Sequence, residues 1–417
     1  MQVLNSLRTD ARLRMFQAMT WAAAQRGDHA SRLMHHPWRA NPYPTHRRLR
    51  AQGALVRSRF GFRTATSHAL VQGILRDRSL GVRPEGPTAE PTGVDLIDLS
   101  FLTRNPPEHT RLRALARPAF TPRMMERYAV EIEKITHDLL DRALAKGRFD
   151  LMADFAQPLP IAVITRLLGV PDDDHAAFVE IGAAIGSSLD GPRSARHLRR
   201  IQDASDRLDA LFDHLMRLRR ADPREDVVSS LTAATDAGEI TPREMAAMCR
   251  LLLVAGFETT VNLIGNGTAA LLRHRDQWDL LTADPGLAGN TVEEVLRYDP
   301  PVQMTSRWVN RDTSIMGHEL RRGSYILCSI GAAGRDPDRF ADPDRFDITR
   351  TDASDHLAFS GGIHYCLGAP LARLEGRIAL HALATRAPRL RPAGRPVHRP
   401  TTTLRGLAAF PVTTGEG

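Results

Sequence analysis

Apolar residues recur along most of this chain at the alternating three- and four-residue steps of an amphipathic helix. Between Ile201 and Leu218 the apolar positions keep this spacing, and arginine and aspartate fill the positions between them. Such a stripe places one helix face against a core and the opposite face in solvent. The pattern therefore predicts a helix over this segment.

The same periodicity predicts five more helices, several of which open with a Thr-Pro or Pro start signal. These helices are Pro122–Ala145, Pro160–Leu168, Thr241–His274, Gly289–Tyr298 and Leu367–Ala387. Short strands are expected at Leu55–Thr64, Tyr325–Ser329 and Leu407–Val412. The chain is thus predicted to be mainly α with small β-sheets.

Two stretches rich in glycine and proline, Gly81–Gly93 and Gly182–Pro192, interrupt the helical pattern. Each is either a linker or a loop over a binding site. Neither is polar or long enough for a linker, so we expect one large helical domain over residues 41–417. Residues 1–40 precede it as an N-terminal extension.

The composition fits a globular protein. The 417 residues are 42% hydrophobic and 25% charged, which excludes disordered and fibrous classes. A chain this long can bury a large core and enclose a cofactor. Three cysteines, Cys249, Cys328 and Cys366, are too few for a disulfide framework and favour a reducing compartment.

Charge and hydropathy indicate where the protein is located and which classes of partner it binds. The net charge of +8 could suit nucleic acid or an acidic protein, but the arginines alternate with acids instead of forming one block, and no nucleic-acid recognition motif is present. The apolar runs fall short of a membrane span, and charges interrupt the N-terminus where a signal peptide would be apolar. We expect a cytoplasmic protein that binds no nucleic acid and has no membrane span.

The most informative segment is FSGGIHYCLGAPLARLE at residues 359–375. Glycines around Cys366 allow tight turns and close approach to a flat ligand. A helix pattern begins directly after the cysteine, and a helix N-terminus favours a thiolate. Cys366 thus suits a metal ligand or a nucleophile, although a cysteine taken alone is more often structural.

This segment resembles the haem-ligand signature FxxGxxxCxG of the cytochrome P450 family, with a histidine two residues before the cysteine as in soluble bacterial members. The resemblance implies a P450 fold that encloses haem b, with Cys366 as the axial thiolate ligand. It also implies that Phe359 packs against the thiolate side and that Gly362 and Gly368 leave room for the haem. His364 would contact a haem propionate.

A second motif, Ala255-Gly-Phe-Glu258-Thr259, matches the family's oxygen-activating helix pattern. An Ala-Gly pair lowers helix stability and permits close approach, and a following threonine can bond back to a carbonyl. By resemblance, Ala255 borders the haem, Thr259 orients dioxygen and water, and Glu258 relays protons.

A third motif, Glu294-Val-Leu-Arg297, is by itself no more than an i, i+3 pair on a helix. The family carries an ExxR pair here that is buried with an arginine from a later segment, for which Asp-Pro-Asp-Arg345-Phe is the candidate. The resemblance implies that these three side chains form a structural network.

Two buried propionates require basic groups from separate elements. Besides His364, His109 and Arg113 match an HxxxR motif, and Arg307 matches a later strand arginine. Their order along the chain, more than any one of them, supports the assignment.

The resemblance implies a haem-thiolate monooxygenase that inserts one oxygen atom from O2 into a lipophilic small molecule. No nucleotide-binding fingerprint is evident, so electrons are expected from a ferredoxin and a ferredoxin reductase that uses NAD(P)H. We expect the ferredoxin to dock at Arg373 and Arg377. The regions expected to contact substrate are mostly apolar, and no charged residue stands out as an anchor, although Gln303 or Arg104 could serve as one.

Three other functions stay open at this stage. A peroxygenase of the same fold would use peroxide directly, but known members replace the acid–threonine pair. A hydrolase could use Cys366 with His364, although their two-residue separation is poor geometry for a nucleophile and its base. A haem-binding sensor would keep Cys366 and have no need of Thr259.

Overall fold

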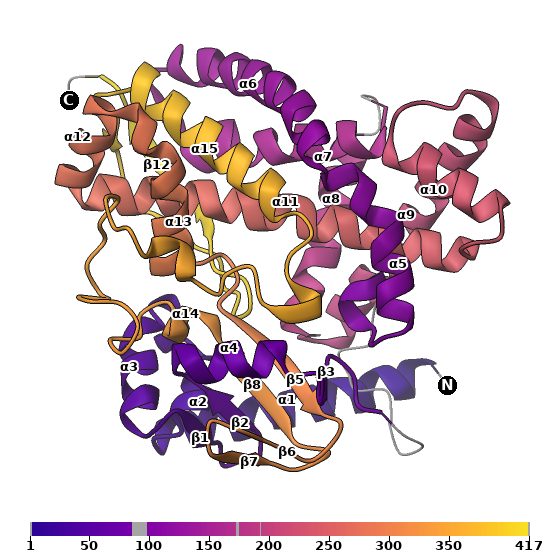
Figure 1. Ribbon diagram of the computed structural model, residues 1–417, viewed down its shortest axis with the longest axis vertical. Coiled ribbons are helices and arrows are strands. Elements are labelled where there is room, and N and C mark those ends of the chain that lie inside the picture. The colour runs from indigo at the N-terminus through magenta and orange to yellow at the C-terminus, as the bar shows by residue number, and fades with distance from the viewer. Residues whose placement is uncertain (1, 86–97, 172–174, 192, 416–417) are drawn as a thin grey trace.

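The computed structural model describes residues 2–85, 98–171, 175–191 and 193–415. Helices make up most of these ranges, and the short strands form small sheets, of which the main one lies at the bottom of the view while β12 lies apart from it (Figure 1). The prediction of a mainly α fold with small β-sheets is therefore confirmed.

The helices predicted from periodicity all form close to their expected ends. They are α6 (Pro122–Leu144), α7 (Pro158–Leu168), α9 (Ala195–Ala221), α11 (Pro242–Arg273), α13 (Ala288–Tyr298) and α15 (Ala369–Arg386). Further helices are α1 (Gln2–Gln25), α2 (His29–Arg32), α3 (Tyr43–Ala51), α4 (His68–Arg76), α5 (Glu108–Ala116), α8 (His175–Gly186), α10 (Val227–Asp236), α12 (Arg275–Ala283) and α14 (Ile330–Ala333). Residues of the N-terminal extension thus form α1, which lies against α9.

Helix α11 runs through the core and contacts α7, α8, α13 and α15 (Figure 1). Its start is fixed by a capping box, in which Thr241 and Glu244 satisfy each other's backbone N–H groups, with Pro242 in the first turn. Among the described residues it is the one helix long and apolar enough to cross a membrane, but 83% of its most apolar window is buried in protein. It has the burial of a core helix.

The main sheet has the strand order β1-β2-β8-β5-β3. Its strands are β1 (Leu55–Arg57), β2 (Arg63–Ala65), β8 (Tyr325–Ser329), β5 (Met304–Val309) and β3 (Leu80–Gly81). Only the β2–β8 pairing is parallel. The sheet lies beside α3, α4 and α14 (Figure 1).

Three smaller sheets complete the fold. One has the order β4-β12-β9, a second pairs β10 with β11, and a third pairs β6 with β7. Their strands are β4 (Arg148–Asp150), β6 (Thr313–Ile315), β7 (His318–Leu320), β9 (Arg391–Pro392), β10 (Val397–His398), β11 (Leu407–Ala409) and β12 (Pro411–Thr413). The first of these sheets pairs β12, near the end of the chain, with β4, which precedes α7.

Two of the three strand predictions were too long. The range Leu55–Thr64 is a hairpin, with Gly61 at φ +86° in its turn. The range Leu407–Val412 is split between β11 and β12, which belong to different sheets. Tyr325–Ser329 forms one strand as predicted.

The predicted break at Gly182–Pro192 was wrong in its first half. Helix α8 continues to Gly186, and a 3-10 turn over Ser187–Asp190 follows it. Small residues in an apolar stretch allow close packing here, because a Cβ at Gly182 would lie 2.6 Å from the Phe257 ring. Of the other range, Gly81 belongs to β3, and residues 86–93 lie outside the described residues.

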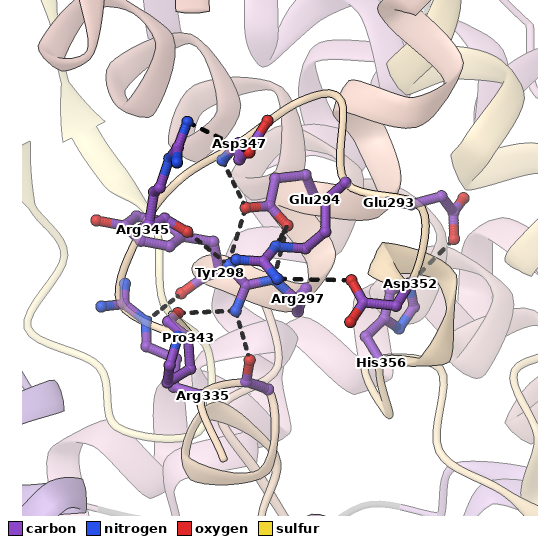
Figure 2. Close-up of polar contacts among 12 residues, drawn as sticks. Glu293, Glu294, Arg297, Tyr298, Arg335, Pro343, Arg345, Asp347, Asp352 and His356 are labelled. Atoms are coloured by element: carbon purple, nitrogen blue, oxygen red, sulfur yellow. Dashed lines mark hydrogen bonds and ion pairs between the residues drawn. The ribbon is translucent and has the colours of Figure 1, made fainter. Parts of the chain in front are cut away.

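The Glu294–Arg297 pair lies fully buried at the centre of a hydrogen-bond network (Figure 2). Arg297 donates from Nε and Nη2 to the two Glu294 oxygens at 2.6 and 2.8 Å. Its remaining hydrogens go to the carbonyl oxygens of Gly334, Pro343 and Arg345 at 2.8–2.9 Å. All five N–H donors of the guanidinium are therefore satisfied.

The predicted side-chain role of Arg345 was wrong. Arg345 joins the network through its backbone carbonyl, while its side chain is 63% exposed and lies 3.6 Å from Asp347 (Figure 2). The arginine whose side chain approaches the pair is Arg350, with Nε 3.8 Å from Glu294 Oε2. The backbone turn directs residue 345 outward, and a sequence motif does not encode that direction.

Glu294→Gln leaves the Arg297 guanidinium buried without its counter-charge, and we expect the free energy of unfolding to fall by about 3–5 kcal/mol. Arg345→Ala is the matched control, because it removes an exposed side chain and keeps the carbonyl that Arg297 uses. That variant should stay within about 0.5 kcal/mol of the parent. Chemical denaturation measures both, and equal losses would contradict the backbone role of Arg345.

Candidate functional site

Helix α11 is accessible at one place in the middle of its buried length. From Ala247 to Leu272, every residue is buried except Ala255, Gly256 and Thr259. Residues 255 and 259 are one turn apart and share a helix face. Accessible surface inside a core helix means that a hollow lies beside it, at the predicted oxygen-activating motif.

Thr259 presents its hydroxyl at this hollow. Its Oγ1 donates to the carbonyl oxygen of Ala255 at 2.9 Å, the bond back to the preceding turn that the sequence suggested. The oxygen's lone pairs are left available to accept. Thr260 is buried away from this face and bonds back to Gly256 instead.

Glu258 points away from Thr259 and into the protein. Its Oε1 accepts from Arg399 Nη1 at 3.0 Å, and Oε2 has no partner among the described residues. Burial raises the pKa of this carboxyl, and Arg399 opposes the rise only in part. A Cβ at Gly186 would collide with Oε2, so the last residue of α8 must be small for the carboxylate to fit.

Cys366 lies in the loop between Phe359 and the start of α15. Its N–H donates to the Phe359 carbonyl oxygen at 2.8 Å, which closes the loop on itself. Burial raises the pKa of the Cys366 thiol, while the backbone N–H of Gly368 and the charge of Arg113 act in the opposite direction. The amides and cations around the sulfur are those that a thiolate needs.

Gly362 meets a requirement that the sequence did not reveal, in addition to the room for haem that was predicted there. Its φ is +62°, and a Cβ would lie 2.7 Å from the Leu75 carbonyl oxygen and 3.1 Å from Arg76 Cα. The glycine therefore lets the cysteine loop approach the end of α4, so close backbone packing is its first requirement. At Gly368, a Cβ would come only within 3.8 Å of the Phe120 ring, so the space there is open.

The four predicted basic residues converge. The His109 and His364 rings lie 4.4 Å apart, and Arg113 Nη2 donates to the Tyr365 carbonyl oxygen at 2.6 Å. Arg307 comes from β5 and reaches Ser360 Oγ at 3.4 Å. Burial and the charges of Arg307, His109 and Arg113 lower the pKa of His364 to about 3.

This basic cluster lacks an anion. Arg307 is only 3% exposed, yet no carboxylate among the described residues pairs with it. Neither ring nitrogen of His109, nor His364 Nε2, has a hydrogen-bond partner in the described part of the chain. Buried cations and donors require anionic partners, so these residues fit the two haem propionates that the sequence implied.

The two suggested substrate anchors are engaged elsewhere. Arg104 Nη2 donates to Asp98 at 2.5 Å. Gln303 Nε2 donates to the Pro300 carbonyl oxygen at 2.8 Å, and its side chain packs over Gly331. Both side chains are held by the protein, which weakens their assignment as substrate anchors.

Three residues with roles at this site escaped sequence analysis: Arg399, Arg350 and Glu293. Arg399 pairs with Glu258 across 141 positions of sequence, and such a contact leaves no local signal. Glu293 binds Arg373 and is discussed below. The one sequence signal for Glu293 was its position beside Glu294. Adjacent residues on a helix point in different directions and so bind different partners.

A shallow hollow of about 520 Å³ opens near the start of α15, and its lining is mostly apolar. Phe120, Met125, Pro370 and Leu374 form its apolar part, and Arg373 and Arg377 belong to the same lining. Arg377 is exposed and forms no ion pair within the described ranges, whereas Arg373 is bound to Glu293 at 2.6 Å. The two arginines predicted to dock a ferredoxin are therefore not equivalent.

Comparisons with known proteins agree with this geometry. The family model "Cytochrome P450" matches residues 286–386, which include the Glu294–Arg297 pair and the Cys366 loop. "Putative cytochrome P450 140" of Mycobacterium tuberculosis is 39% identical over 410 residues, covering 94% of this chain and 93% of that protein.

Two further similarities extend the match. "Cytochrome P450 monooxygenase PikC" of Streptomyces venezuelae is 40% identical over 388 residues, 89% of this chain and 91% of that protein. The solved structure of P450BioI, in complex with an acyl carrier protein ligated to hexadec-9Z-enoic acid, superposes with a TM-score of 0.85 at 38% identity. It covers 90% of this chain and 98% of that one.

Proposed function

This chain belongs to the cytochrome P450 family of haem-thiolate monooxygenases, and from that we propose that Cys366 supplies the axial thiolate and that the substrate is a lipophilic small molecule. The observation that carries the proposal is the accessible patch of Ala255, Gly256 and Thr259 within an otherwise buried helix. A hollow enclosed by a core helix suits a flat cofactor with substrate and O2 beside it.

Cofactor binding falls to residues of three separate elements. Arg307 on β5, His109 and Arg113 on α5, and His364 in the cysteine loop would hold the propionates of haem b. Ala255 and Gly368 would border its ring, and Phe359 would cover the thiolate side. When bound, the haem supplies the activation of O2 and the route by which electrons reach it.

Proton handling falls to two neighbouring residues on α11. One oxygen atom enters the substrate and the other leaves as water, a reaction that consumes two electrons and two protons. Thr259 Oγ1 can pass a proton because it both donates and accepts. Glu258 is the second candidate, since burial raises the pKa of its carboxyl and its Oε2 has no hydrogen-bond partner in the described part of the chain.

A lipophilic substrate fits the residues on the helix that borders the hollow. Of the three accessible residues of α11 there, Ala255 and Gly256 have no polar side-chain group. The P450BioI structure contains hexadec-9Z-enoic acid ligated to an acyl carrier protein, and a chain of this kind is lipophilic. Hydroxylation or epoxidation, in secondary metabolism or in lipid or xenobiotic oxidation, is the reaction class we assign.

Electrons would come from a ferredoxin and its NAD(P)H-dependent reductase, in the cytoplasm. The hollow at the start of α15 lies on the helix that follows Cys366 and combines an apolar lining with the exposed charge of Arg377. An acidic ferredoxin with an apolar contact residue fits this surface. Arg373 contributes less to docking than Arg377, because two of its guanidinium nitrogens are already bonded to Glu293.

The first experiment is the carbon monoxide difference spectrum of the reduced protein. We expect the long-wavelength Soret band of a thiolate-ligated haem, and its loss in Cys366→Ala. Cys328→Ala is the control, since that thiol is buried in a separate cluster beside the main sheet and should leave the band intact. A short-wavelength band in the parent protein would mean a different ligand and favour the sensor.

Thr259→Ala removes the hydroxyl at the hollow. With substrate present, we expect product per electron to fall about tenfold, and peroxide to be released instead. Thr260→Ala removes a neighbouring hydroxyl that is buried away from the hollow and should keep normal coupling. Oxygen, NADPH and product are measured together, and normal coupling in Thr259→Ala would remove this role.

Arg377→Glu reverses the exposed charge beside the apolar hollow. Reduction by an acidic ferredoxin should slow about tenfold at low salt and approach the parent rate at high salt. Arg217→Glu on α9 makes the same change outside the hollow and should have no effect. Stopped-flow reduction at several salt concentrations checks both, and equal slowing by the two variants would mean that docking occurs elsewhere.

A further inference from the structure

Arg373 is held rigidly on the side of the molecule where the cysteine loop lies. Its Nε and Nη2 donate to the two carboxylate oxygens of Glu293 at 2.6 and 2.9 Å, and its Nη1 donates to the Tyr365 hydroxyl at 3.1 Å. The guanidinium carbon lies 4.5 Å from the centre of the Phe359 ring. Every nitrogen of this side chain therefore has a partner.

Glu293 is in turn fixed by a second group. His356 Nε2 lies 3.2 Å from Glu293 Oε2, and the two side chains face each other in Figure 2. The other ring nitrogen, Nδ1, accepts the N–H of Ala358 at 3.1 Å. Burial by itself would raise the pKa of Glu293, but Arg373 and His356 overcome this effect and lower it to about 2. The carboxylate is thus charged at all physiological pH values.

Within this ion pair it is the cationic partner, Arg373, that contacts the segment carrying Cys366. Phe359 lies under the guanidinium, and its carbonyl oxygen accepts the Cys366 N–H. Tyr365, which accepts from Arg373, immediately precedes the cysteine. A charge that is partly removed from water and cannot swing away acts on its neighbours more strongly than a mobile surface charge.

Arg377 offers the contrast, one turn further along α15. It is exposed and has no ion pair within the described ranges. Arg373 is 34% exposed and bound on three sides. On the same helix, therefore, Arg373 contacts the cysteine loop and Arg377 lies at the surface.

We propose that Arg373, fixed by Glu293, is a positioning residue that sets the charge environment of the Cys366 thiolate and so makes the bound iron easier to reduce. This inference rests on the proposed function, because it takes Cys366 as the ligand. Reduction adds a negative charge to the iron site, and a nearby fixed cation favours the reduced state. Removing that cation makes reduction harder.

The test is a chemical redox titration of the purified holoprotein without any protein partner. At the midpoint potential of the parent, Arg373→Gln should lower the ratio of ferrous to ferric protein about three- to tenfold. Arg377→Gln removes the same charge one turn away and should leave the ratio within about twofold. Arg373→Lys keeps the charge but loses the bidentate bond, so its shift should have the same sign and be smaller.

The outcomes separate this inference from the proposed function. If the parent lacks the long-wavelength carbonyl band, the assignment of Cys366 fails. If the parent has that band and Arg373→Gln titrates like the parent, or Arg377→Gln shifts as far, only the role of Arg373 is overturned. If Arg373→Gln yields no stable holoprotein, Arg373→Lys decides, and a ratio equal to that of the parent would refute the role.

Discussion

The buried pair of Glu294 and Arg297 is the interaction on which the rest of the structure depends. An unpaired guanidinium in a dry interior is very costly, so this charge can exist there only if every N–H finds an acceptor. Three of its acceptors are backbone carbonyls from residues 334–345. One helix side chain thereby fixes the path of an irregular chain segment that leads towards the Cys366 loop and has little regular structure of its own.

The candidate site differs from the Glu294–Arg297 pair in how its buried hydrogen-bond donors are satisfied. Around Arg297 every donor is satisfied by the protein, whereas both ring nitrogens of His109 and Nε2 of His364 have no hydrogen-bond partner among the described residues, and Arg307 has no carboxylate partner there. The first arrangement stabilises a fold and the second prepares for a ligand. The contrast identifies a binding region without reference to any motif, and it agrees with the accessible patch on α11.

The sequence predicted the helices, whose apolar residues recur with a regular period. It missed contacts that depend on the direction in which a side chain points. Helix ends such as Pro122 and Tyr298 were found because Pro start signals and apolar periodicity are local. The roles of Arg345 and Arg350 were not, because two arginines five positions apart in one turn-rich segment are chemically alike, and only the backbone path decides which one faces inward. The Glu258–Arg399 contact joins distant segments for the same reason. Gly362 was recognised as necessary, but the neighbour that requires it, the end of α4, is not encoded nearby.

The cluster of Arg307, His109, Arg113 and His364 has a consequence for how the protein persists in a cell. Without an anion, the charges of Arg307 and Arg113 are held in a partly desolvated space, and the folded chain bears an unfavourable energy that the unfolded chain avoids. A ligand that binds only the native state adds stability in proportion to the logarithm of its concentration over its dissociation constant. A shortage of haem is therefore expected to lower the stability of the folded chain as well as its activity.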